Sequence, residues 1–137
     1  MKVELNDFAA LLAAAIWADG EYAEAEATAV EEIADAFELD VTELKSAVEA
    51  EIEKIKDFDE EAIRNYVNEA ASGVAREDAP AVFEAILQIV IVDNVFTRDE
   101  AENLLFAADA LDIDTEEVLL LIADLVRSEP DLEVQFN

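Results

Sequence analysis

The sequence predicts one all-α domain, a compact bundle of about seven helices built from two duplicated three-helix units. Apolar residues recur at intervals of three and four along almost the whole chain, which is the spacing of one helix face. Glycine and proline are scarce, with 2 of each in 137 residues, so long irregular segments are not expected. The first half of the chain also matches the second half when the two are aligned at a shift of 74 residues.

Seven apolar stripes mark the predicted helices. The fifth stripe, Val82–Val92, is apolar nearly all round, so its helix should be buried on most sides. Ile89–Val92 alone could form a buried strand, but the length of the apolar segment that begins at Ala81 favours a helix. The other stripes run over residues 8–16, 30–37, 44–55, 63–74, 104–111 and 118–126.

Capping residues define several expected helix starts. Asp40 and Asp114 each stand three residues before a glutamate at the start of an apolar stripe, which suits a helix N-cap. Thr97 and Glu100 have the spacing of a capping box, in which each side chain accepts a hydrogen bond from a backbone N–H group.

Two prolines mark further boundaries. Pro80 is tolerated only in a first helical turn, so a helix should begin close to Asp78. Pro130 should end the last helix, and we expect residues 130–137 to form a flexible tail of the single domain 1–137.

The internal duplication rests on positions that punctuate the helices. At the shift of 74 residues, Asp93 falls on Asp19 and Glu100 falls on Glu26, and the apolar stripes coincide as well. We therefore predict an internal repeat, with its two units paired about an approximate two-fold axis. The repeat spans roughly residues 5–56 and 78–129, and a helix over 57–74 joins the units.

The charge limits the function classes. The chain has 36 acidic and 8 basic residues and a formal net charge of −28. Such a surface repels nucleic acid and anionic lipid, so no nucleic acid is expected as a direct ligand. It attracts cations and basic protein surfaces. Alternatively, the charge serves solubility or adaptation to a salty cytoplasm.

The missing residue types argue against catalysis. The chain has no cysteine and no histidine, which excludes thiolate chemistry, a catalytic triad and the usual transition-metal sites. Any bound metal should be a hard cation on carboxylate and carbonyl oxygens. A carboxylate-metal hydrolase is the less favoured alternative, because two-metal chemistry needs closely spaced carboxylates and usually a further base or electrophile. We expect no enzyme activity.

No targeting segment is visible in the sequence. The N-terminus turns acidic at Glu4, and the most apolar segment, Ala85–Val92, is interrupted by Gln88 and too short to span a bilayer. We expect a cytoplasmic protein without a transmembrane segment.

The acidic turn Asp19-Gly20-Glu21 is the most informative motif. Gly20 can adopt the left-handed conformation that ends a helix, and Glu26 falls in the first turns of the next helix. The carboxylates of Asp19, Glu21 and Glu26 could then converge and bind Ca²⁺ or Mg²⁺. The alternative is that an acidic residue near a helix N-terminus is stabilised by the helix dipole alone.

The counterpart turn in the second unit contains Asp93 and Glu100. Thr97 gives Glu100 a capping role, whereas the residue that corresponds to Thr97 in the first unit is Ala23, which cannot cap. In the second unit Val95 also stands at the position that Glu21 occupies in the first. The first turn is therefore the better candidate for a cation site.

The run Leu11–Glu21, followed by Glu26 and Ile33–Phe37, resembles the tellurite-resistance TerB-like family. The resemblance covers most of the chain. It implies a bundle of about seven helices and a divalent-cation site, and carried over to this chain the site residues are Asp19, Glu21, Glu26, Asp93 and Glu100. It also implies a role in tellurite or stress resistance through partner proteins, often near the inner membrane, with no catalytic activity.

Two functional hypotheses follow. The first is a non-enzymatic acidic binding module that holds a divalent cation through the Asp-Gly-Glu turn. The second is a structural or protein-interaction domain whose acidic surface serves solubility, salt adaptation or the docking of a basic partner.

Overall fold

The computed structural model describes residues 4–19, 24–91, 95–128 and 133–135, and it leaves out the side chains of residues 18, 19, 95–100, 125, 126, 128 and 133–135. Within these ranges the chain forms seven α-helices and two three-residue strands. The elements are α1 Leu5–Asp19, α2 Glu24–Ala36, α3 Val41–Ile55, α4 Glu60–Ala71, α5 Ala79–Val90, β1 Val95–Thr97, α6 Arg98–Ala110, α7 Thr115–Ser128 and β2 Glu133–Gln135. The predicted all-α class and the predicted number of helices are confirmed.

The two strands were not predicted. β1 and β2 pair in parallel, with Val95 opposite Glu133 and Thr97 opposite Gln135. β2 lies within residues 130–137, for which we expected a flexible tail. Three residues are too few to show an alternating pattern, and their partner lies far away in the sequence, so the local sequence carries no strand signal.

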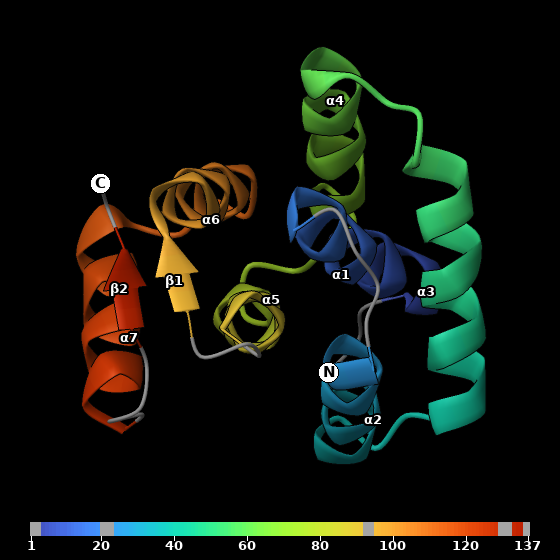
Figure 1. Ribbon diagram of the computed structural model, residues 1–137, viewed down its shortest axis with the longest axis horizontal. Helices are drawn as coiled ribbons and strands as arrows, with labels where there is room; N and C mark the ends of the chain where they lie inside the picture. The colour runs from blue at the N-terminus through green and yellow to red at the C-terminus, as the bar shows by residue number, and fades with distance from the viewer. Residues whose placement is uncertain (1–3, 20–23, 92–94, 129–132, 136–137) are drawn as a thin grey trace.

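The helices are arranged around a central pair. Figure 1 shows α1 and α5 in the middle of the molecule, with α3 along one edge and α7 along the opposite edge. α2 lies at one end, and α4 and α6 lie toward the other. α1 contacts α3, α4, α5 and α6, so it is the helix around which most of the others pack.

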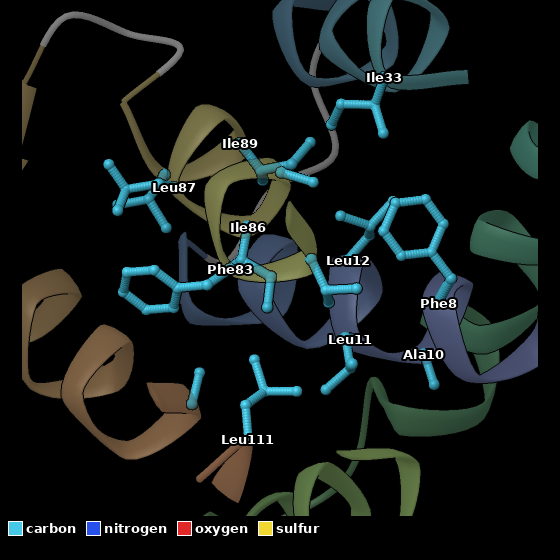
Figure 2. Close-up of a cluster of buried hydrophobic side chains, with 14 of the residues drawn as sticks. Phe8, Ala10, Leu11, Leu12, Ile33, Phe83, Ile86, Leu87, Ile89 and Leu111 are labelled. Atoms are coloured by element: carbon cyan, nitrogen blue, oxygen red, sulfur yellow. The ribbon is translucent and has the colours of Figure 1, made fainter. Parts of the chain in front are cut away.

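The hydrophobic core fills the space around α1 and α5. Figure 2 shows part of this cluster, with Leu11 and Leu12 from α1 and Phe83 and Ile86 from α5. Eight of the twelve residues of α5 are buried, which confirms that the fifth helix is enclosed on most sides. No helix in the described ranges is long and apolar enough to cross a membrane.

Helix caps agree with the local sequence. The Asp40 side chain caps α3, because its Oδ1 accepts a hydrogen bond from the backbone N–H of Glu43 at 3.0 Å. Asp59, which the sequence analysis did not single out, caps α4 in the same way through Ala62, at 2.8 Å. This cap makes α4 shorter than the joining helix that was expected over residues 57–74. Pro80 stands in the first turn of α5, as predicted.

The helix starts of the two units follow the repeat. Leu5, Glu24 and Val41 begin α1, α2 and α3, and the residues 74 positions later, Ala79, Arg98 and Thr115, begin α5, α6 and α7. The units differ in how their third helix packs: α3 lies against α1, whereas the contact of α7 within the described residues is chiefly with α6. The approximate two-fold axis therefore stays a prediction.

The turns after α2 and α6 have the same backbone structure. Glu38 and Asp112 are 74 residues apart, and both have a positive φ, 57° and 59°. In each turn two backbone hydrogen bonds close the helix end in the Schellman pattern. They run from Glu38 N–H to Asp35 O and Leu39 N–H to Ala34 O, and from Asp112 N–H to Asp109 O and Ile113 N–H to Ala108 O.

Candidate functional site

Glu26 is the one predicted site residue whose side chain the structure describes. It lies in the first turn of α2 and is 4 % exposed. Among the residues whose burial is described, it is the only charged or polar one that is buried. The positive end of the helix dipole favours a carboxylate at this position.

The burial of Glu26 follows from its place on the helix face. Ala29, Val30 and Ile33 are buried on α2, and they stand three, four and seven residues after Glu26. Glu26 therefore extends the apolar stripe of α2 by one turn, and its carboxylate is directed to the side on which the helix meets the core. This placement distinguishes it from Glu24, Glu31 and Glu32 on the same helix, which are exposed.

The remaining predicted ligands are placed only in part. Asp19 is the last residue of α1, but its side chain is outside the description. Glu21 and Asp93 lie outside the described residues altogether. The predicted convergence of Asp19, Glu21 and Glu26 therefore stays a prediction. Among the described side chains, no group of three or more acidic residues is placed to hold a metal ion.

The second unit repeats the position of Glu26 at Glu100. Glu100 is the third residue of α6, and Leu104 and Ala107, four and seven residues later, are buried. Thr97 comes directly before α6, which is the position that the predicted capping box requires. The side chains of Thr97 and Glu100 are outside the description, so the capping bonds themselves stay a prediction.

A cavity of about 340 Å³ lies between α1, α4, α5 and α6. Its wall is mainly apolar, with Trp17 from α1, Val67 from α4 and Phe106 from α6. Trp17 is partly buried and lines this cavity. The lining combines four helices that are far apart in the sequence, so periodicity within one helix could not reveal it.

Arg64 is the cationic group of this cavity. Its guanidinium carbon lies 5.8 Å from the centre of the Phe106 ring, within the range of a cation–π interaction. Glu60 and Glu102 line the same cavity and carry the opposite charge. The lining residues that the structure describes therefore offer apolar contact together with charges of both signs.

Carboxylates also gather where α1, α3 and α4 meet. Partial burial raises the pKa of Asp7 above its ordinary value of 3.8, and the negative charges of Glu4, Glu69 and Glu51 raise it further. Close by, burial raises the pKa of the Tyr66 hydroxyl well above its usual range, with a further contribution from Glu51. Both partial burial and the neighbouring negative charges thus disfavour the charged form of Asp7.

Comparison with known proteins identifies the family. The family model described as tellurite resistance protein TerB matches residues 6–121, from the first turn of α1 to the middle of α7. The matched range includes both acidic turns and all four helices of the cavity. No curated protein and no solved structure matches the chain.

Proposed function

We propose that this chain, which belongs to the tellurite resistance protein TerB family, acts as a non-enzymatic binding module. The family match confirms the resemblance that was found in the sequence. In the proposal, the first acidic turn holds Ca²⁺ or Mg²⁺ through Asp19, Glu21 and Glu26. Asp93 and Glu100 form the weaker counterpart in the second unit, where Val95 replaces the middle carboxylate.

The burial of Glu26 is the observation that carries this proposal. An ionised carboxylate is costly to bury unless hydrogen bonds or opposite charge compensate it. Glu26 stands at the start of α2, close in sequence to Asp19 at the end of α1, so a cation at this turn would supply such compensation. Glu26 also interacts with other groups of the chain, and a cation at the turn would act in addition to these groups.

The ligand chemistry fits a hard cation. Ca²⁺ takes six to eight oxygen ligands and Mg²⁺ takes six, in both cases from carboxylates, carbonyls and water. Three carboxylates and the carbonyls of a turn belong to this set. The net charge of −28 would also raise the local concentration of divalent cations around the site.

Calorimetric titration with Ca²⁺ and with Mg²⁺ tests the site. The full chain should give a saturable heat that Asp19→Asn and Glu26→Gln abolish. Glu24→Gln removes an equal charge from an exposed neighbour on α2, so it is the matched control and should leave the heat unchanged. If all three variants bind as the unmodified chain does, the first turn is not the cation site.

A second candidate function is the docking of a basic protein partner on the acidic surface. Most acidic residues of the described helices are exposed, and the described lysines pair with carboxylates of their own or a neighbouring helix. The surface thus keeps a strong negative potential that would attract a basic partner. The proposed role of the binding module in a cytoplasmic stress response would include such a partner, near the inner membrane.

Thermal melts separate specific binding from charge screening. If the charge serves only solubility or salt adaptation, the melting temperature should rise smoothly with ionic strength, and CaCl₂ and NaCl at equal ionic strength should act alike. A bound cation instead stabilises the folded state by mass action, so CaCl₂ should exceed the matched NaCl and EDTA should reverse the gain.

A further inference from the structure

Three leucines of the second unit are exposed. Leu105 on α6 is 48 % exposed, and Leu119 and Leu120 on α7 are 59 % and 66 % exposed. They are the only large apolar side chains exposed to this degree among those described. Single exposed leucines are common on protein surfaces, but a group of them indicates an interaction site.

The first unit has polar residues at the same positions. The residues 74 positions before Leu105, Leu119 and Leu120 are Glu31, Lys45 and Ser46. The Lys45 Nζ and Glu31 Oε1 atoms lie 2.9 Å apart and form an ion pair that links α3 to α2. The second unit therefore has two leucines where the first unit has a surface ion pair.

The shared turn relates the positions of these leucines to those of the first unit. α2 and α3 are joined by the same Schellman turn as α6 and α7, with Glu38 and Asp112 at the equivalent left-handed position. By this correspondence Leu105 and Leu119 stand at the positions that carry the Glu31–Lys45 ion pair in the first unit. We call Leu105, Leu119 and Leu120 the leucine face.

Acidic residues surround the leucine face. Glu102 and Asp109 stand about one turn before and after Leu105 on α6. Glu116 and Asp124 stand one turn before and after Leu120 on α7. All four acidic residues are exposed. The surface thus has an apolar centre with a negatively charged rim.

We infer that the leucine face docks an amphipathic, basic helix of a partner protein. Aliphatic side chains of such a helix would cover the leucines, and its lysine or arginine residues would meet the acidic rim. The inference rests on the second candidate function and gives it a location. A second copy of this chain is the less suitable occupant, because two acidic rims would face each other in a molecule of net charge −28.

Fluorescence anisotropy with a labelled synthetic peptide tests the inference on the full chain. The peptide, of roughly 18 residues, has leucines at positions i, i+3, i+4 and i+7 and lysines elsewhere. A second peptide has the same composition in an order that gives no apolar stripe. We expect the amphipathic peptide to bind at least about tenfold more tightly than the shuffled one.

The decisive variant is Leu105→Glu combined with Leu119→Lys. It rebuilds the ion pair of the first unit and leaves the net charge unchanged, so a loss of affinity reports the apolar contact. We expect at least about a tenfold weaker affinity for the amphipathic peptide. Glu31→Lys combined with Lys45→Glu reverses the ion pair of the first unit, and this matched control should bind normally. Leu120→Ser, at a 66 % exposed position, is the second variant should the double variant fail to fold.

The outcomes distinguish the inference from the candidate function on which it rests. If both peptides bind equally and the leucine variants have no effect, basic partners bind through charge alone. The inference about the leucine face is then overturned, while the second candidate function stands. If neither peptide binds, both are overturned. A concentration-dependent dimer that the double leucine variant abolishes would overturn the inference in favour of a second copy as the occupant.

Discussion

The carboxylate of Asp7 lies beside Gly73 at the place where a side chain would begin, so that a Cβ atom at position 73 would meet the Asp7 Oδ2 atom. Asp7 belongs to the first turn of α1, and Gly73 follows the end of α4. The absence of a side chain at Gly73 therefore lets the start of α1 approach the end of α4.

Gly73→Ala should have different effects in two backgrounds. Replacing glycine by alanine at a compatible backbone position stabilises a protein by about 0.4–1 kcal/mol, because the unfolded chain loses freedom. In the unmodified chain the Asp7 carboxylate must move away from the new methyl group, which should reduce this gain. In an Asp7→Ala background the full gain should appear in urea unfolding. Additive effects of the two substitutions would contradict the contact.

Asp7→Asn should stabilise the protein at neutral pH but not in acid. The pKa of Asp7 is raised above 3.8, so the folded state binds the proton more tightly than the unfolded state does. The stability that this group contributes is therefore present below pH 3.8 and is lost as the pH rises through the folded pKa. Above that range its charge is repelled by its acidic neighbours.

The measurement is the melting temperature of the unmodified chain and of Asp7→Asn between acid and neutral pH. The difference should grow as the pH rises. Asp35→Asn, at an exposed position on α2, gives the effect of removing one negative charge elsewhere. An equal gain from both variants at every pH would show that net charge alone, and not the surroundings of Asp7, determines the result.

Glu38→Gly should stabilise the fold. Glu38 has a φ of 57°, a left-handed conformation that costs a non-glycine residue about 1 kcal/mol and costs glycine almost nothing. Glu38→Gln removes the charge but keeps the Cβ atom, so it separates backbone strain from electrostatics. Asp112→Gly should gain less, because aspartate tolerates this conformation better than glutamate does. Urea denaturation gives the free energies of unfolding. An equal gain in stability from Glu38→Gly and Glu38→Gln would show that backbone strain is not the cause.

Leu12→Ala should destabilise the protein by about 2–5 kcal/mol, the usual cost of such a truncation in a packed core. Leu12 is 0 % exposed on the central helix α1. The matched control is Leu120→Ala, the same truncation at a 66 % exposed position, which should change stability by no more than about 0.5 kcal/mol. Chemical unfolding of both variants measures the difference, and similar costs would place Leu12 outside the core.

Much of the helical architecture could be predicted because its causes are local. The all-round apolar character of Val82–Val92 predicted a buried helix, and Asp40 predicted the start of α3 through its side-chain cap. The pairing of β1 with β2 could not be predicted, because it depends on contacts between short segments far apart in the chain. The joining helix was expected to begin at residue 57, whereas Asp59 caps α4 and sets its start two residues later.

The features of the candidate site also differ in whether the sequence could predict them. Glu26 could be singled out because Ala23, at the position of Thr97, cannot form the local capping bond. The cavity beside Arg64 could not be predicted from the sequence, because helices from both units and the joining helix form its wall. The leucine face needed both kinds of information: the repeat supplied the comparison with Glu31 and Lys45, and the fold supplied the exposure.

The position of α7 at the edge of the bundle has a consequence for local unfolding. Among its described side chains only Val118 is buried, whereas α3 has Leu44, Val48 and Ile55. Because α7 lies at the edge of the bundle and contacts chiefly α6 within the described residues, we expect it to open at a lower free energy than the whole domain. Its amide hydrogens should then exchange with deuterium sooner than those of α1. A partner helix docked on Leu119 and Leu120 would slow this exchange, and part of its binding energy would be spent on holding α7 in place.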